Sequence, residues 1–123
     1  MTKIAIIEDD PTISQMYLTK FEADGFDVQL ANNGKHGIEL VETFLPDMIL
    51  LDLQMPEMNG LDALKIMRKH EWGKNTPVII LTNMGEEESP KELKALGVLS
   101  YIVKANLTPS QVVQRVKEAL NIT

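Results

Sequence analysis

The stretch DMILLD, residues 47–52, places four apolar residues in a row between two aspartates. A strand with one face in water would alternate apolar and polar residues, whereas a run that is apolar at every position is typical of a strand buried on both faces. Such strands occur in parallel sheets that carry helices on both sides. The stretch therefore predicts a central strand of an α/β domain.

Four further segments have the length and composition of strands. The runs KIAIIE (3–8) and PVIILT (77–82) are again almost entirely apolar. The segment FDVQLA (26–31) alternates, as an edge strand does, and VLSYIV (98–103) predicts a fifth strand. The chain should therefore contribute five strands to one sheet.

Segments with helical start and stop signals lie between these strands. We expect Asp10 to cap a first helix that has Pro11 in its first turn and ends at Gly25. A second helix is expected over about 34–45, and a third should begin after Asn59 and Gly60.

Two capping boxes mark the remaining helices. Ser89 and Thr108 are each followed by proline, and then by Glu92 or Gln111 three residues on. They predict a fourth helix that starts late, near residue 89, after an acidic loop at 86–88, and a fifth helix from about 109. The apolar residues expected to face inward are Ile13, Met16, Tyr17, Phe21, Ile38, Val41, Leu45, Leu61, Leu64, Met67, Val112, Val116 and Leu120.

The alternation of five strands with five helices predicts a parallel sheet covered on both faces. We expect a flavodoxin-like (βα)5 three-layer sandwich with strand order 2-1-3-4-5, formed by residues 1–123 as one domain. Ligands of such sheets bind at the carboxyl ends of the strands, beside the switch point between strands 1 and 3.

Acidic residues follow the two strands at that switch point. Glu8, Asp9 and Asp10 end the first strand, and Asp52 ends the third. Neighbouring strands lie about 5 Å apart, and crowded carboxylates raise each other's pKa unless a cation joins them. Oxygen ligands without His or Cys suit Mg²⁺, with Mn²⁺ as a substitute. Asp10 precedes Pro11, which favours a helix cap over a metal ligand.

The fourth and fifth strands lead into residues with hydrogen-bond donors. Thr82 ends the fourth strand, and Lys104 follows the fifth. A hydroxyl and an ammonium group can both hold phosphoryl oxygens. Taken singly, Thr82 is an ordinary strand former and Lys104 an ordinary solvated lysine. Together with Asp52 as nucleophile, they favour phosphoryl transfer to a carboxylate.

These residues resemble a known family, the receiver domains of bacterial two-component response regulators. The resemblance rests on the acidic pair after the first strand, LLDLQMPEMNG (50–60), Thr82 and SYIVK (100–104), and it extends over the whole chain. It implies that Asp52 accepts a phosphoryl group from the phosphohistidine of a sensor histidine kinase or phosphotransfer protein. It also implies a signalling phosphoacceptor that assists its own phosphorylation and dephosphorylation, not an enzyme with a separate substrate.

The resemblance also implies a set of magnesium ligands. Asp9 and Asp52 would bind Mg²⁺ directly, Glu8 would bind it through water, and the backbone carbonyl of Gln54 would complete the set.

Phosphoryl oxygens would be held by Thr82 and Lys104, and Tyr101 stands at the aromatic switch position. The change would reach the surface of helix 4, strand 5 and helix 5, and so control an output protein or a fused output domain. Homodimerisation through this surface is compatible with the family.

Several positions depart from the pattern of the family. Asn83 stands where a small residue usually follows the threonine, and Ala105 replaces the proline that usually follows Lys104. Gln54 and Met84 flank the site at positions that tune dephosphorylation in the family.

Composition limits the partners and the location. Of the 123 residues, 44% are hydrophobic and 24% charged, and the net charge is −6, so we expect no direct nucleic-acid binding. No apolar run approaches the ~20 residues of a membrane helix, and no signal-peptide pattern is present, so a cytoplasmic location is expected. The chain has no cysteine, which excludes thiolate chemistry.

Three other functions compete with that of a phosphoacceptor. A metal-dependent aspartyl phosphatase commonly has a second aspartate two residues after the nucleophile, where this chain has Gln54. A nucleotide- or flavin-binding module would need a glycine-rich loop after the first strand, where this chain has three acidic residues that would repel a phosphate. A pseudo-receiver that only docks to partners stays open because of Asn83.

Overall fold

Residues 1–122 are described by a computed structural model of the chain. In these residues five parallel strands form one sheet, in the order β2-β1-β3-β4-β5. The strands are β1 (Lys3–Ile7), β2 (Asp27–Ala31), β3 (Met48–Leu51), β4 (Val78–Thr82) and β5 (Val98–Val103). The predicted strand order is confirmed.

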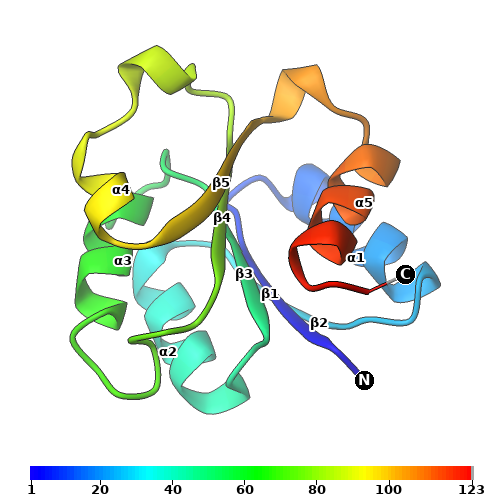
Figure 1. Cartoon of the computed structure of the whole chain (residues 1–123), viewed down its shortest axis with the longest axis horizontal. Helices are drawn as coiled ribbons and strands as arrows, with labels where there is room; N and C mark the ends of the chain where they lie inside the picture. The colour runs from blue at the N-terminus through cyan, green and yellow to red at the C-terminus, as the bar shows by residue number, and fades with distance from the viewer. Residues whose placement is uncertain (123) are drawn as a thin grey trace.

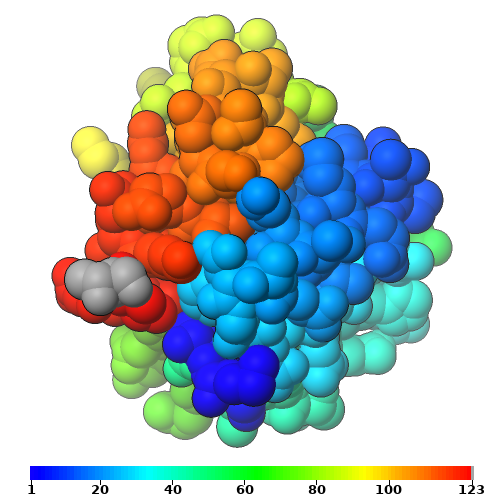
Figure 2. All heavy atoms as spheres, turned by 90° about the vertical axis from the view of Figure 1, so that its right-hand side faces the viewer, coloured from blue at the N-terminus to red at the C-terminus, as the bar shows by residue number. Residues whose placement is uncertain are grey.

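Helices cover both faces of the sheet, which makes three layers (Figure 1). The helices α1 and α5 lie on one side, and α2, α3 and α4 lie on the other. Figure 2 views the first of these sides, where α1 in blue and α5 in orange and red lie near one another. The helices are α1 (Pro11–Ala23), α2 (Gly34–Phe44), α3 (Gly60–Met67), α4 (Glu92–Ala95) and α5 (Pro109–Ala119), with 3-10 turns η1 (Glu86–Glu88) and η2 (Lys104–Asn106).

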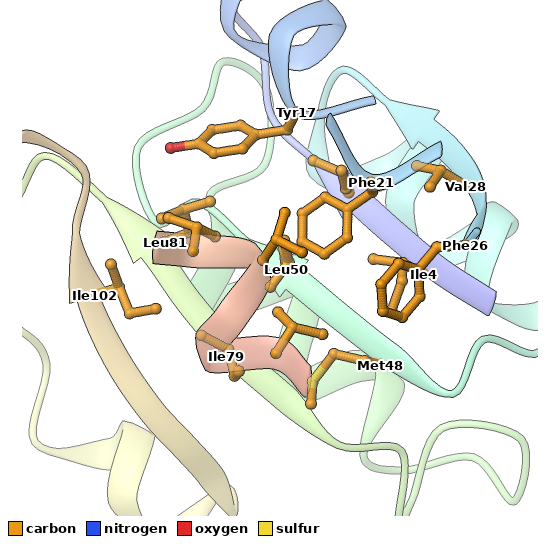
Figure 3. Close-up of a cluster of buried hydrophobic side chains, with 14 residues drawn as sticks. Ile4, Tyr17, Phe21, Phe26, Val28, Met48, Leu50, Ile79, Leu81 and Ile102 are labelled. Carbon is orange, nitrogen blue, oxygen red and sulfur yellow. The ribbon is translucent and has the colours of Figure 1, made fainter. Parts of the chain in front are cut away.

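Two apolar clusters, one on each face, hold these layers together. Along β1, Ile4 and Ile6 join the cluster under α1 and α5, while Ala5 and Ile7 join the opposite cluster. Figure 3 shows the first cluster, in which strand residues meet the aromatic side chains of α1. All four residues of β3 are buried, which is why residues 48–51 are apolar at every position.

Most of the predicted helix ends are confirmed. The side chain of Asp10 accepts hydrogen bonds from the backbone N–H groups of Thr12 and Ile13, at 2.9 and 3.2 Å. Thr108 and Gln111 form the predicted capping box of α5. Gly25 follows α1 with a φ of +89°, a conformation that glycine adopts at little cost.

The predicted start of α4 near residue 89 is wrong. The helix begins at Glu92, so it starts even later than expected and has four residues. Ser89 does not cap it: its hydroxyl donates to the carbonyl of Glu86, at 2.6 Å, and closes the 3-10 turn η1. Ser89 has extended backbone angles, which are favoured for a residue that precedes proline.

Two residues expected inside are exposed. Met16 is 43% exposed on α1, and Leu45 is 56% exposed. The helix α2 ends at Phe44, and Leu45 follows it in the left-handed region with a φ of 52°. This turn points Leu45 outward and leaves Phe44, 8% exposed, in the core.

Within residues 1–122, no helix has both the length and the apolar character that crossing a membrane would require.

Candidate functional site

The register of β1 and β3 brings three carboxylates together. Ile7 pairs with Leu51, and the backbone N–H of Asp52 donates to the carbonyl of Ile7 at 3.0 Å. Carboxylate oxygens of Glu8, Asp9 and Asp52 consequently lie within 4.8 Å of one another. Glu8 and Asp52 are buried, whereas Asp9 is exposed. The predicted convergence of acids at the switch point is therefore present.

Lys104 extends from the end of β5 into this acidic group. Its ammonium donates to Oδ2 of Asp52 at 2.9 Å and to Oε1 of Glu8, and its side chain is 9% exposed. Although burial acts against the charged form, the hydrogen bonds to Glu8 and Asp52 raise the pKa of Lys104. Burial raises the pKa of Glu8, and the charge of Asp52 adds to the effect, while Lys104 opposes it.

Backbone and side-chain contacts fix the two buried carboxylates. The N–H of Gln54 donates to Oδ1 of Asp52, and the N–H of Asp10 donates to Oε2 of Glu8, each at 3.0 Å. The hydroxyl of Ser14 on α1 donates to the carbonyl of Glu8 at 3.2 Å. Glu8 and Asp52 are thus held in place by groups of the loops and of α1.

A glycine lets the loop after β3 turn tightly beside Asp52. A Cβ atom added to Gly60 would lie 2.1 Å from the backbone oxygen of Asp52. The N–H of Gly60 donates to the carbonyl of Leu53 at 3.1 Å. Only glycine permits this close approach of the start of α3 to the end of β3.

Thr82 and Tyr101 are connected through one residue. Thr82 is fully buried at the end of β4, and its hydroxyl accepts a hydrogen bond from the N–H of Met84 at 3.4 Å. The hydroxyl of Tyr101 donates to the carbonyl of Met84 at 2.9 Å. Asn83, between Thr82 and Met84 in the chain, is exposed. The segment after β4 therefore joins the edge of the acidic site to the surface of β5.

The structure thus brings Glu8, Asp9, Asp52 and Lys104 into one group and places Thr82 at the neighbouring strand end. Two contacts were missed by sequence reasoning. The pairing of Lys104 with Glu8 joins positions 96 residues apart, and the serine of α1 that binds the Glu8 carbonyl carries no motif. A serine among the inward-facing residues of a helix was the one available signal.

Comparisons with known proteins agree with this geometry. A family model described as "Response regulator receiver domain" matches residues 4–117. The regulatory protein AtoC of Escherichia coli is 38% identical over 104 residues, which cover 85% of this chain and 22% of that protein. The transcriptional regulatory protein SrrA of Staphylococcus aureus is 37% identical over 121 residues, which cover 98% of this chain and 48% of that protein.

The chain therefore spans less than half of the length of these two relatives. Among solved structures, the chemotaxis protein CheY4 of Vibrio cholerae superposes with a TM-score of 0.88 at 27% identity, over 96% of this chain and 98% of that one. The matched family, the curated relatives and the shared fold lead to one conclusion: the chain belongs to the family of response regulator receiver domains.

Proposed function

We propose that residues 1–123 act as one receiver unit that accepts a phosphoryl group on Asp52. The donor would be the phosphohistidine of a sensor histidine kinase or of a phosphotransfer protein. The observation that carries this proposal is the position of the Asp52 carboxylate, which is buried, hydrogen-bonded to Lys104 at 2.9 Å and close to two further carboxylates. An aspartate that only caps a helix or forms a turn does not require burial beside a lysine and two further carboxylates.

The donor set fits a magnesium ion. Glu8, Asp9 and Asp52 supply oxygen atoms alone, as hard divalent cations require, and they converge within 4.8 Å. We propose that Asp9, Asp52 and the backbone carbonyl of Gln54 would hold the ion directly and Glu8 through water, with Mn²⁺ as a substitute. When bound, the ion supplies positive charge that offsets the negative charge of the phosphoryl oxygens.

The reaction follows from the groups around Asp52. A carboxylate oxygen of Asp52 attacks phosphorus, the new P–O bond forms, and the P–N bond to the donor imidazole breaks. The electron pair of that bond stays on the imidazole nitrogen, which then takes up a proton. Lys104, already within hydrogen-bond distance of Asp52, and Thr82 on the adjacent strand would donate to the phosphoryl oxygens.

The output is proposed to follow from the link between Thr82 and Tyr101. If Thr82 turns toward the phosphoryl group, the Met84 segment moves, and the 2.9 Å bond from Tyr101 to the Met84 carbonyl changes partner. The population then shifts between two packings of the surface made by α4, β5 and α5. That surface would bind an output protein, an output domain or a second copy. Asn83, Met84 and Gln54 would set the rate of dephosphorylation.

Phosphorylation of Asp52 can be tested directly. The purified chain is incubated with Mg²⁺ and acetyl phosphate, and the expected result is a mass increase of one phosphoryl group that Asp52→Asn abolishes. A matched control is Asp62→Asn, because Asp62 is exposed in the first turn of α3 and should leave the adduct unchanged. If the unaltered chain forms no adduct, the proposal fails and a docking module is favoured. Multiple turnovers on phosphate esters would instead favour a phosphatase.

A further inference from the structure

Tyr17 on α1 is a buried group that the proposed phosphotransfer does not use. Its side chain is 2% exposed and belongs to the cluster under α1 and α5. Figure 3 shows its ring at one end of that cluster, with the hydroxyl oxygen pointing away from Phe21. A purely apolar role would be filled equally well by phenylalanine or leucine, so the hydroxyl calls for a partner.

The position of Tyr17 along α1 places it next to the acidic site. Ser14 precedes it by three residues, and residues so spaced share one face of a helix. The Ser14 hydroxyl touches the carbonyl of Glu8, so this face of α1 lies against the residue that Lys104 binds. Burial raises the pKa of Tyr17. The charge of Lys104 lowers this pKa and the charge of Glu8 raises it, in agreement with a position of Tyr17 near both groups.

Both Tyr17 and Lys104 have unused hydrogen-bonding capacity. A lysine ammonium has three donors, and Lys104 uses two of them, on Glu8 and Asp52. Of the two tyrosines in residues 1–122, Tyr101 donates its hydroxyl hydrogen to a protein group, and Tyr17 does not. No buried side-chain polar atom there is fully enclosed and unpaired, so the Tyr17 oxygen is reached by water.

We propose that Tyr17 is a positioning residue for Lys104: its hydroxyl accepts the third ammonium hydrogen through one bridging water molecule. The contact directs Nζ onto Glu8 and Asp52. It is made before phosphorylation, and its effect on phosphorylation rests on the function proposed above. Tyr17 itself does not touch the transferred group.

The direct test is the side chain of Lys104 in the protein without donor. In Tyr17→Phe, which removes one oxygen and keeps the ring, the ¹³Cε and ¹⁵Nζ signals of Lys104 should shift. The signals of Lys117, which pairs with Asp24 at 2.8 Å, should stay in place as an internal control. A Lys104 shift no larger than that of Lys117 overturns the proposal, whether or not the chain accepts phosphate.

A kinetic test separates positioning from packing. At saturating Mg²⁺, Tyr17→Phe should lower the maximal rate of phosphorylation by acetyl phosphate about two- to tenfold, the range of one net hydrogen bond, with Mg²⁺ affinity unchanged. Tyr17→Leu should show the same rate loss together with lower stability. An unchanged rate in Tyr17→Phe overturns the effect on phosphorylation. Failure of the unaltered chain to be phosphorylated would count against the proposed function and leave the signals of Lys104 as the decisive result.

Discussion

Replacement of Arg68 by methionine should destabilise the fold far more than the loss of an ordinary surface charge. Arg68 follows α3, and its guanidinium donates to three backbone carbonyls. These belong to Leu96 at 2.8 Å and to Gly73 and Thr76 at 2.7 Å each. One side chain therefore ties the end of α3 to the loop before β4 and to the turn between α4 and β5.

The magnitude follows from those three hydrogen bonds. A hydrogen bond to a charged group contributes about 1.5–3 kcal/mol, but these groups are partly buried and the carbonyls can regain water in the variant. Burial of the guanidinium, which lowers the pKa of Arg68, offsets part of the gain. We therefore expect Arg68→Met to lower the free energy of unfolding by about 2–4 kcal/mol, a large part of the 5–15 kcal/mol typical of a domain.

Urea unfolding followed by the fluorescence of Trp72 measures this effect, because Trp72 lies in the loop that Arg68 holds. With a slope of about 2 kcal/mol per molar urea, the middle of the usual range, the midpoint should fall by about 1–2 M. The control is Lys65→Met, which removes an exposed ion pair with Glu92 at 3.2 Å and should cost at most about 1 kcal/mol. A midpoint for Arg68→Met no lower than that of the control would refute the reasoning.

Three further predictions concern the caps, the loop after β3 and a surface ion pair. Asp10→Ala should lower the free energy of unfolding by about 1 kcal/mol in urea titrations, because two N–H groups lose their acceptor, and Asp10→Asn should recover most of it. Equal stability of the two variants would contradict a capping role. Gly60→Ala should slow formation of the Asp52 adduct, because the added Cβ would lie 2.1 Å from the Asp52 carbonyl oxygen and must displace the loop; an unchanged rate would show that the loop accommodates it. The hydrogen bond from Lys117 lowers the pKa of Asp24 below its usual 3.8. The stabilising contribution of this ion pair is therefore present above the pKa of Asp24 in the unfolded chain and is lost as the pH falls through its pKa in the folded chain. In an NMR titration Lys117→Met should return the Asp24 midpoint toward 3.8, and an unmoved midpoint would exclude the ion pair as the cause.

The central strands and the acidic site could be predicted because their signals are local. Residues 48–51 are apolar at every position since both faces of β3 are covered, and Asp10 with Pro11 forms a cap within one turn. The convergence of Asp52 with the acids after β1 then follows from strand order alone, because parallel strands end at the same edge.

The remaining features depend on competition or on distant contacts. Ser89 could cap a helix or close the turn before it, and its hydroxyl is bound to the Glu86 carbonyl of that turn. The extended backbone before proline does not distinguish the two roles, because Thr108 has the same conformation before Pro109 and does cap a helix. The exposure of Leu45 depends on where α2 stops, which helical periodicity alone does not define. The pairing of Lys104 with Glu8 depends on how two side chains lie after the sheet has formed.

The shortness of α4 has a consequence for motion. A helix of four residues gains little from its own backbone hydrogen bonds, so its buried side chain, Leu93, supplies much of what keeps it folded. Segments of this kind open locally at a small fraction of the global free energy of unfolding. Slow-exchanging amides should therefore concentrate in β1, β3 and β4, while the single turn at 92–95 exchanges readily and can be rearranged without disturbing the sheet behind it.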